Sequence, residues 1–529
     1  PVSCFGARIA RRSIYRGTSL NDYLAHRLPP LDNPDPSMWI DEAIWGHRYH
    51  DEQFPWLIFL EFLNVFSHEH RKGRAFEEKE GFNTLKYRPA RRLFLRNLLF
   101  NNPKADQLAR QNVGDSFLWN TWVKEMRYAQ GLNEPRFEYL KDRFHNFKDF
   151  VDVVGLLRST SLELNTNKRW TSKFVYPYGM DCLYEDLNKD ARTNDRNFFG
   201  RTGELLYLML SRSSTKELLR SLLVNHLILQ NSKWNQIAKA LQPTEEEDSG
   251  SELGKSFLPY ASHHCYDDLA NDWIAILKLG LPGYDALPHL VNLAAFHLVQ
   301  YQLRVARDIV GITSPFKMVC EIVAPNKTLV REISCELYQE NNLLSSQAIM
   351  AYIDSVERSD EWQRTKTQPG AFVNCRSFLQ EKVLWGDDYE GASNPDDLIN
   401  ELRTSAKRRH QQHIAHIHRN YGREIGLVSK RGTVKLRYAP TDDFLKSLIF
   451  ANVPKRIELH QFLALLWQRY ALIFGDHEAE AVLAKDDFDK KAFQANTRRL
   501  EQRLGSLGLL KRLSDGCAYV LNPYAESKT

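Results

Sequence analysis

The sequence contains few cysteines, and none of them stands at the spacing of a metal-binding or redox motif. Seven cysteines are spread over 529 residues without a Cys-x-x-Cys pair. An odd, scattered set of this kind is typical of reduced thiols in a cytosolic protein and argues against a disulfide framework. His263, His264 and Cys265, followed by Asp267 and Asp268, form a cluster of ligand types, but no second cluster completes a zinc site. We therefore expect a cytoplasmic protein with no metal and no cofactor.

Long apolar runs and a large net charge are also missing. The uninterrupted apolar stretches are much shorter than the ~20 residues that span a bilayer. The basic residues Arg8, Arg11, Arg12 and Arg16 are followed by no apolar stretch of the kind that a secretory signal contains. The formal net charge is only +5, so the chain as a whole is not a polycation. We expect no membrane partner, and any binding of a polyanion must depend on local basic segments.

The common catalytic signatures are absent from the sequence. It has no Gly-x-Ser-x-Gly elbow, no His-Glu-x-x-His motif and no dinucleotide or kinase fingerprint. Residues 250–256 resemble a phosphate-binding loop, but this loop is one residue short, and Pro259 interrupts the helix that should follow. The acidic side chains of Asp181 and Glu185 lack the partners that a metal-dependent nuclease needs. The sequence favours a non-enzymatic protein, and a divergent metal-dependent nuclease is an alternative.

Helical periodicity dominates the sequence. A chain of 529 residues exceeds one hydrophobic core and predicts about three domains. β-Branched residues flank Pro325 and Asn326 as in a hairpin, which predicts a small β element near residues 316–338. We expect a mainly α, multidomain protein. Its expected parts are an N-terminal helical domain (1–242), an acidic flexible linker (243–254), a second mainly helical domain (255–400), a basic connector (401–454) and a winged helix-turn-helix domain (455–529).

The C-terminal segment carries the clearest pattern. Apolar residues at spacings of three and four predict a helix over residues 459–473. A short helix over residues 478–483 follows, and a third helix then buries Leu500 and Leu504. The Asp-Gly pair at 515–516 is a favoured hairpin turn between two short strands. Three helices followed by a hairpin are the order of a winged helix-turn-helix.

The third of these helices presents residue types that suit the recognition of DNA. The side opposite its apolar face carries Asn496, Arg498, Arg499, Gln502 and Arg503, and the hairpin adds Lys511 and Arg512. Asn, Gln and Arg side chains read base edges in the major groove, and basic residues near the hairpin meet phosphates. We therefore predict that these seven residues contact duplex DNA. The alternative is that the winged helix docks another protein and that its arginines are only solvated.

A basic segment precedes the winged helix. Between Arg403 and Arg437, basic residues greatly outnumber acidic ones. We expect an arm that neutralises phosphates, with an affinity that falls steeply with salt. The residues expected to make these contacts are Lys407, Arg408, Arg409, Lys430 and Arg431. An exposed charged helix between two domains would have the same composition.

Three segments carry a resemblance to a class of bacterial proteins. They are residues 198–207, 436–443 and 514–520, and in them the chain resembles uncharacterised accessory proteins of multi-gene anti-phage defence systems. Those systems are linked to DNA modification, as the methylation-associated ones are. The resemblance implies a DNA-binding subunit of a complex whose other subunits hold methyltransferase, nuclease or ATPase activity, and it implies no active-site residue. We expect such a non-enzymatic subunit, and a scaffold whose winged helix docks a partner subunit is the alternative.

Overall fold

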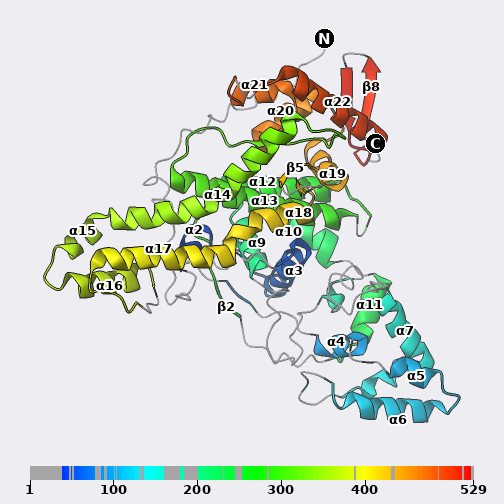
Figure 1. The fold of residues 1–529 in the computed structure, drawn as a ribbon. Coiled ribbons are helices and arrows are strands. Elements are labelled where there is room, and N and C mark those ends of the chain that lie inside the picture. The colour runs from blue at the N-terminus through cyan, green and yellow to red at the C-terminus, as the bar shows by residue number, and fades with distance from the viewer. Residues whose placement is uncertain are drawn as a thin grey trace.

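Helices predominate in the computed structural model, as the sequence predicts (Figure 1). The structure describes residues 39–46, 49, 53–77, 85–87, 92–100, 102, 104–129, 132, 136–159, 179–183, 201–229, 232–244, 253–282, 285–385, 389–430, 435–485, 488–514 and 517–525. Within these ranges the strands are short and form sheets of two or three strands. No helix in the same ranges has both the length and the apolar character that crossing a bilayer requires.

The largest hydrophobic core surrounds one long and mostly buried helix, α13 (Ala286–Val310). It ends at Gly311, whose φ of +79° is the left-handed conformation that glycine adopts readily after a helix. The helices that pack on α13 include α2 (Trp39–Trp45), α3 (Pro55–Arg71), α12 (His264–Lys278), α14 (Leu329–Glu357), α18 (Ile417–Glu424) and α19 (Asp442–Asn452). On the side of α3, α9 (Thr202–Ser211) adds a further layer. Segments far apart in the sequence therefore share one core.

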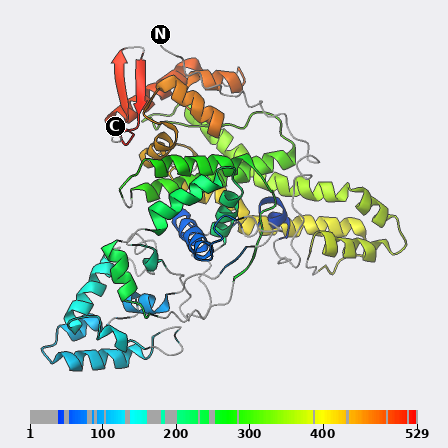
Figure 2. The same cartoon turned by 180° about the vertical axis from the view of Figure 1, so that it is seen from behind.

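A second, smaller core is formed by helices from the first half of the chain. Its helices are α4 (Leu93–Phe100), α5 (Ala105–Ala109), α6 (Asp115–Met126), α7 (Phe147–Ser159) and α11 (Lys233–Ala240). Trp122 of α6 packs edge-on against Phe150 of α7, with ring centroids 4.8 Å apart. This cluster lies apart from the main body in both views (Figure 1, Figure 2). Because α2, α3 and α9 belong to the main core, helices of the expected domain 1–242 contribute to both cores.

Most of the expected acidic linker, at residues 245–252, lies outside the described residues. Its last two positions, Leu253 and Gly254, begin the strand β2 (Leu253–Ser256), which pairs antiparallel with β1 (Leu85–Tyr87). Lys255 and Ser256 therefore lie in a strand, whereas a phosphate-binding loop places such residues at the start of a helix.

The hairpin expected around Pro325 and Asn326 does not form. In its place, β3 (Met318–Val319) is a two-residue strand, and the 29-residue helix α14 begins at Leu329. The hydroxyl of Thr328 caps this helix by accepting a hydrogen bond from the backbone N–H of Arg331 at 3.2 Å. The β-branched side chains that suggested a strand, such as Ile333, are buried on α14. Of the expected β element, only β3 is present.

From α14 the chain forms an elongated helical projection, seen at the left of Figure 1. The helices of this projection are the far end of α14, α15 (Asp360–Lys366), α16 (Ala371–Lys382) and α17 (Pro395–Gln412). Arg403 of α17 joins the two long helices, since its guanidinium is 2.8 Å from the carboxylate of Asp354 on α14 and also pairs with Glu357. The basic connector expected over residues 401–454 is folded, because it contains two thirds of α17, all of α18 and α19, and the paired strands β4 (Val428–Ser429) and β5 (Arg437–Tyr438).

The last part of the described chain forms a unit of three helices and a three-stranded sheet, which we call the C-terminal unit. In chain order its elements are β6 (Arg456–Glu458), α20 (Leu459–Tyr470), β7 (Leu472–Ile473), α21 (Asp476–Val482), α22 (Lys490–Ser506), β8 (Leu510–Ser514) and β9 (Cys517–Leu521). The sheet has the order β6-β9-β8 and is antiparallel, and the turn at 515–516 lies outside the described residues. Separately, β7 pairs in parallel with β3, which attaches the C-terminal unit to the main body.

Candidate functional site

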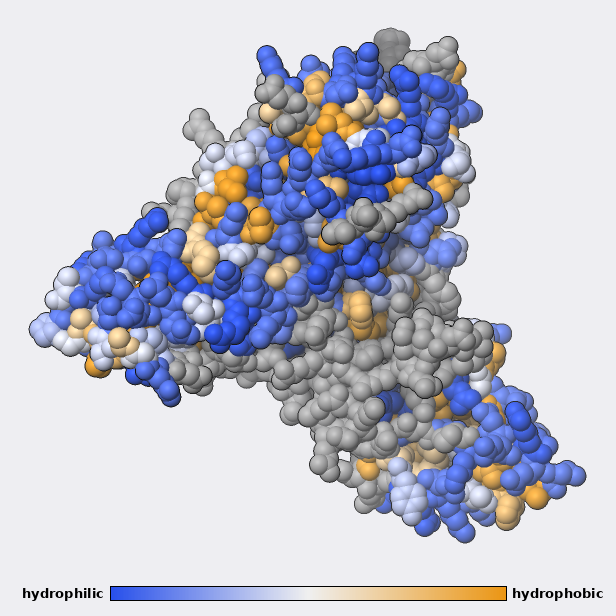
Figure 3. Space-filling model, in the orientation of Figure 1, coloured by the Kyte–Doolittle hydropathy of each residue, from blue (hydrophilic) through white to orange (hydrophobic). Residues whose placement is uncertain are grey.

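The helix α22 has one face in solvent and the other against the main body. Lys491, Arg498 and Gln502 are exposed and follow one another at helical spacing along the solvent face. The surface over this end of the molecule is largely hydrophilic (Figure 3). A helix face with two cations and an amide, lying next to a hairpin, is a surface that can approach an extended polyanion.

The predicted contact residue Asn496 faces the other way. It is fully buried, and its amide nitrogen donates to the carbonyl oxygens of Cys320 and Phe474, both at 3.0 Å. Its amide oxygen accepts a hydrogen bond from the backbone N–H of Ile322 at 2.8 Å. The expectation that Asn496 reads a base is therefore not met in this conformation, because backbone groups of the main body and of the residue after β7 use its hydrogen-bonding groups.

We expect Asn496→Ala to lower the free energy of unfolding by about 1–3 kcal/mol, because it leaves buried backbone groups of residues 320–322 without partners. The matched control is Gln502→Ala on the exposed face of the same helix, which we expect to change stability by less than about 0.5 kcal/mol. Urea denaturation of both variants measures the difference. Equal stability of the two variants would show that Asn496 does not hold α22 on the body.

Two other predicted residues, Arg499 and Arg503, lie at the edge between the two faces. Arg499 donates from Nε to the carbonyl oxygen of Ile322 at 3.2 Å. Arg503 forms an ion pair with Asp442 and donates to the carbonyl oxygen of Pro440 at 3.2 Å. Both arginines line a hollow of about 630 Å³ whose other lining residues are Ile322, Val323, Gln502 and Ser506. The structure thus brings Arg499, Gln502 and Arg503 together. The two arginines already contact other groups of the chain, whereas Gln502 is exposed.

The hairpin of β8 and β9 extends the cationic surface beyond α22. Lys511 and Arg512 are exposed on β8. Arg512 lies 3.5 Å from the carboxylate of Glu501 on α22, a surface ion pair that leaves more than half of the arginine side chain in solvent. Such exposed pairs contribute little to stability, so Arg512 can exchange this partner for another anion at small cost.

The residues expected to form a basic arm do not join this surface. Lys407 and Arg408 are exposed on α17, whereas Arg409 is partly buried near Asp41. Burial raises the pKa of Asp41 to about 7, and the positive charge of Arg409 acts in the opposite direction. Lys430 is exposed after β4, and Arg431 lies outside the described residues. Both views show α17 well away from α22 (Figure 1, Figure 2). The cations of α17 and those of α22 therefore belong to different faces of the molecule.

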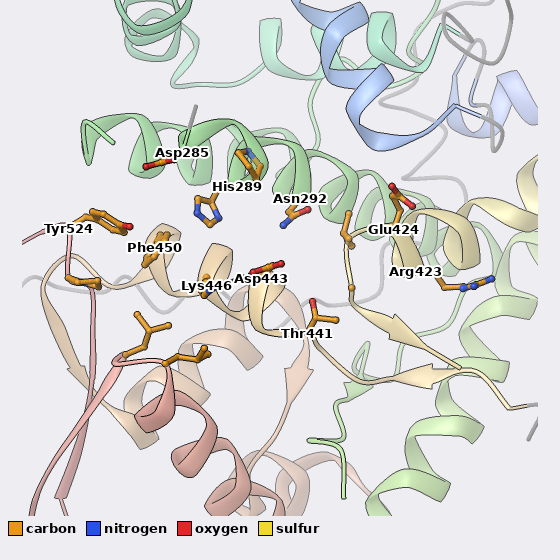
Figure 4. Close-up of a pocket in the computed structure, with 16 residues that line it drawn as sticks. Asp285, His289, Asn292, Arg423, Glu424, Thr441, Asp443, Lys446, Phe450 and Tyr524 are labelled. Atoms are coloured by element: carbon orange, nitrogen blue, oxygen red, sulfur yellow. Dashed lines mark hydrogen bonds and ion pairs between the residues drawn. The ribbon is translucent and has the colours of Figure 1, made fainter. Parts of the chain in front are cut away.

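A cavity of about 780 Å³ lies between α13, α19 and the C-terminal unit (Figure 4). Asp285, His289 and Asn292 line it from α13 and the turn before that helix, and Asp443, Lys446 and Phe450 line it from α19. Tyr524 closes one end, with its ring centroid 5.1 Å from that of Phe450. We call this space the α13–α19 cavity. Sequence reasoning did not identify it, although the polar residues at positions 285, 289 and 292 follow one another at helical spacing at the start of α13.

The cluster of His263, His264 and Cys265 at the start of α12 brings three donor atoms within 4.8 Å of one another, and it is the one such group among the residues that the structure describes. The Nδ1 atom of His263 accepts a hydrogen bond from the backbone N–H of Cys265 at 3.2 Å and so caps the helix. Burial lowers the pKa of His263 to about 3 and raises the pKa of the Cys265 thiol. His263 therefore has a structural role as the cap of α12, and the Sγ atom of Cys265 lies 3.5 Å from Nε2 of His264.

The acidic residues considered for a nuclease are held by other parts of the protein where the structure describes them. Asp181 exchanges two hydrogen bonds with Asn235, at 2.9 and 2.8 Å, and lies 3.7 Å from the guanidinium of Arg92. Glu185 lies outside the described residues. These contacts join the 3-10 turn Met180–Cys182 to α11 and account for Asp181 without a metal ion.

The chain matches no known protein family, no curated protein and no solved structure.

Proposed function

We propose that the chain binds duplex DNA through its C-terminal unit, which acts as a winged helix. The order of its elements supports this proposal, since three helices are followed by a two-stranded hairpin that pairs with a short strand ahead of the first helix. In this arrangement α22 takes the place of the recognition helix and the hairpin of β8 and β9 takes the place of the wing.

The observation that carries the proposal is the cationic solvent face of α22 and β8. Lys490, Lys491, Arg498, Lys511 and Arg512 are all exposed there, and Glu501 is the acidic residue of α22. Each cation that neutralises a phosphate releases counterions, which gives affinity for any duplex. Arg498 and Gln502 have the side chains that read base edges when a helix enters the major groove. Arg499 and Arg503 lie beside them and can add phosphate contacts at the rim of the helix.

Lys407 and Arg408 have a smaller part in this proposal, because α17 lies away from α22. A duplex long enough to reach α17 would gain phosphate contacts there. The membership of a bacterial defence complex, which the sequence resemblance implies, stays a prediction.

The direct test is the affinity of the full chain for a fluorescein-labelled duplex, measured by fluorescence anisotropy at several salt concentrations. With about four phosphate contacts, we expect affinity to fall on the order of 100-fold between about 50 and 200 mM salt. A winged helix that docks only a partner protein would give no salt-dependent affinity for the duplex. Absence of binding at the lowest salt concentration would therefore replace our proposal with the scaffold alternative.

A further inference from the structure

The α13–α19 cavity has the volume of a small-molecule site. Its volume of about 780 Å³ lies inside the range of about 300–1,000 Å³ that is typical of ligand pockets. Figure 4 shows that the side chains of α13 and those of α19 face each other across this space. Polar groups lie along the middle of the cavity, and the aromatic rings of Phe450 and Tyr524 lie at one end. This distribution suits a flat ligand with a polar edge.

The hydrogen bonds around Ser447 fix the chemical form of His289. The single hydroxyl hydrogen of Ser447 is donated to the carbonyl oxygen of Asp443, at 2.9 Å. The Ser447 oxygen must therefore accept from the amide nitrogen of Asn292 at 3.2 Å and from Nδ1 of His289 at 2.9 Å. Burial also lowers the pKa of His289 to about 4, so the ring is neutral at physiological pH. His289 thus carries its proton on Nδ1, and its Nε2 atom is a hydrogen-bond acceptor.

The same hydrogen bonds leave Asn292 with its amide oxygen as a further acceptor at the cavity. The exposed carboxylates of Asp285 and Asp443 can also accept hydrogen bonds there. Among the groups on α19, Lys446 is the donor, with its ammonium nitrogen 3.3 Å from Asp443. The lining of the cavity therefore combines several acceptors with two cations, because Arg423 and Glu424 of α18 also line it and Lys446 lies directly next to the carboxylate of Asp443.

A guanine base has the matching arrangement along one edge. Its ring N–H and exocyclic amino group are two adjacent donors, and its carbonyl oxygen is an acceptor beside them. A carboxylate accepts from both donors at once, and an adjacent ammonium group donates to the carbonyl oxygen. Adenine has an acceptor nitrogen where guanine has the ring N–H, and uracil has no amino group, so both would leave the carboxylate partly unpaired.

We propose that the α13–α19 cavity binds guanine, with Asp443 accepting from the ring N–H and the amino group and Lys446 donating to the carbonyl oxygen. Phe450 and Tyr524 give the flat ring an aromatic contact. Nε2 of His289 and the amide oxygen of Asn292 accept from water or from a hydroxyl group of an attached sugar. The base can be part of a free nucleotide or an unpaired base in a nucleic-acid strand, because the recognised edge is the same in both.

The test is isothermal titration calorimetry of the full chain with guanosine, inosine, adenosine and uridine. We expect guanosine to bind, and inosine, which lacks the amino group, to bind about tenfold more weakly because one hydrogen bond to a charged acceptor is lost. Adenosine and uridine should give no measurable heat. Equal affinity for the four nucleosides would overturn the proposal, since the polar edge would then not be read.

A variant pair and a second probe complete this experiment. Asp443→Asn should weaken guanosine binding about tenfold or more, because the amide accepts at one atom only. Asp152→Asn, at an exposed position of α7, should bind guanosine as the original chain does. A short DNA strand with one unpaired guanine distinguishes the two sources of the base. If the strand binds more tightly than guanosine, the natural ligand is a guanine in a nucleic acid, and if it binds more weakly, the natural ligand is a free nucleotide. If neither guanosine nor this strand binds, the cavity has no guanine site, whatever the affinity of α22 for a duplex.

Discussion

The substitution Asp272→Ala is expected to lower the free energy of unfolding by about 3–5 kcal/mol, because it removes the anionic partner of a largely buried guanidinium. Asp272 of α12 is fully buried, and its carboxylate accepts hydrogen bonds from Arg469 at 2.6 Å, Tyr470 at 2.7 Å and His297 at 2.8 Å. Arg469 and Tyr470 are the last residues of α20, so this network joins the C-terminal unit to α12 and α13. Urea denaturation measures the loss.

The control for this substitution is Asp152→Ala on α7, where an exposed carboxylate is removed. We expect that control to change stability by less than about 0.5 kcal/mol. If Asp272→Ala were no less stable than Asp152→Ala, the network would not hold the C-terminal unit on the body.

The contribution of Asp272 should also depend on pH in a defined direction. Burial raises the pKa of Asp272, but the Arg469 guanidinium and the hydrogen bonds from His297 and Tyr470 together lower it below its ordinary value. A carboxyl group whose pKa is lower in the folded state stabilises the protein above its unfolded pKa of about 4, and this stabilisation is lost as the pH falls further. The stability difference between the original chain and Asp272→Ala should therefore stay constant down to about pH 4 and shrink below it.

The helices of the C-terminal unit follow from the sequence, but one boundary does not. Apolar spacing predicts the first helix over residues 459–473, whereas α20 ends at Tyr470. Ala471 has a φ of +60°, and its carbonyl oxygen accepts a hydrogen bond from the backbone N–H of Met318 at 2.8 Å. The helix stops because residues 471–473 pair with β3, and a strand partner about 150 positions away leaves no sign in the local pattern.

The orientation of α22 follows from helical spacing, but the polar side chain of Asn496 suggested the opposite orientation for that residue. Asn496 lies four residues before the buried Leu500, so a helix places both side chains on one face. It is buried because its amide bonds to two backbone groups of the main body. The amide oxygen accepts from the N–H of Ile322, and the amide nitrogen donates to the carbonyl oxygen of Cys320. Helical spacing therefore predicts that Asn496 is buried, and the tertiary structure was required to show which backbone groups its amide contacts.

Counting basic residues overestimated the cationic surface before the C-terminal unit. Arg437 belongs to the expected basic segment, yet it is buried and forms an ion pair with Glu321, which also contacts Arg331 at 2.9 Å. Arg403 is held by Asp354 and Glu357 of α14. The acidic partners lie on α14 or in the segment between β3 and α14, so a count of charges within residues 403–437 misses them.

The proposed binding of DNA depends on the exposed cations of α22 and β8. Removal of these cations should therefore weaken duplex binding strongly. The variant has four substitutions, Lys491→Ala, Arg498→Ala, Lys511→Ala and Arg512→Ala. All four side chains are exposed, and the ion pair between Arg512 and Glu501 lies at the surface. Such pairs are worth at most about 1 kcal/mol, so we expect the variant to fold normally.

The matched control removes the same number of positive charges from the surface of the helices that form the second core. Arg110, Lys124, Arg127 and Lys148 are exposed on or next to α5, α6 and α7, and they are likewise two arginines and two lysines. Changing these four residues to alanine lowers the net charge of the chain by the same amount. A long-range effect of net charge would weaken duplex binding equally in both variants, whereas a contact surface at α22 and β8 would weaken it in one of them.

The decisive experiment on DNA binding by the C-terminal unit is the salt dependence of duplex affinity, measured for these two variants beside the original chain. If α22 and β8 contact phosphates, the four substitutions there should reduce the slope of log affinity against log salt by roughly three to four and weaken binding on the order of 100-fold at about 50 mM salt. The control variant should keep the slope of the original chain. An unchanged slope for the α22 and β8 variant, or an equal loss in both variants, would contradict the proposal that the C-terminal unit grips DNA.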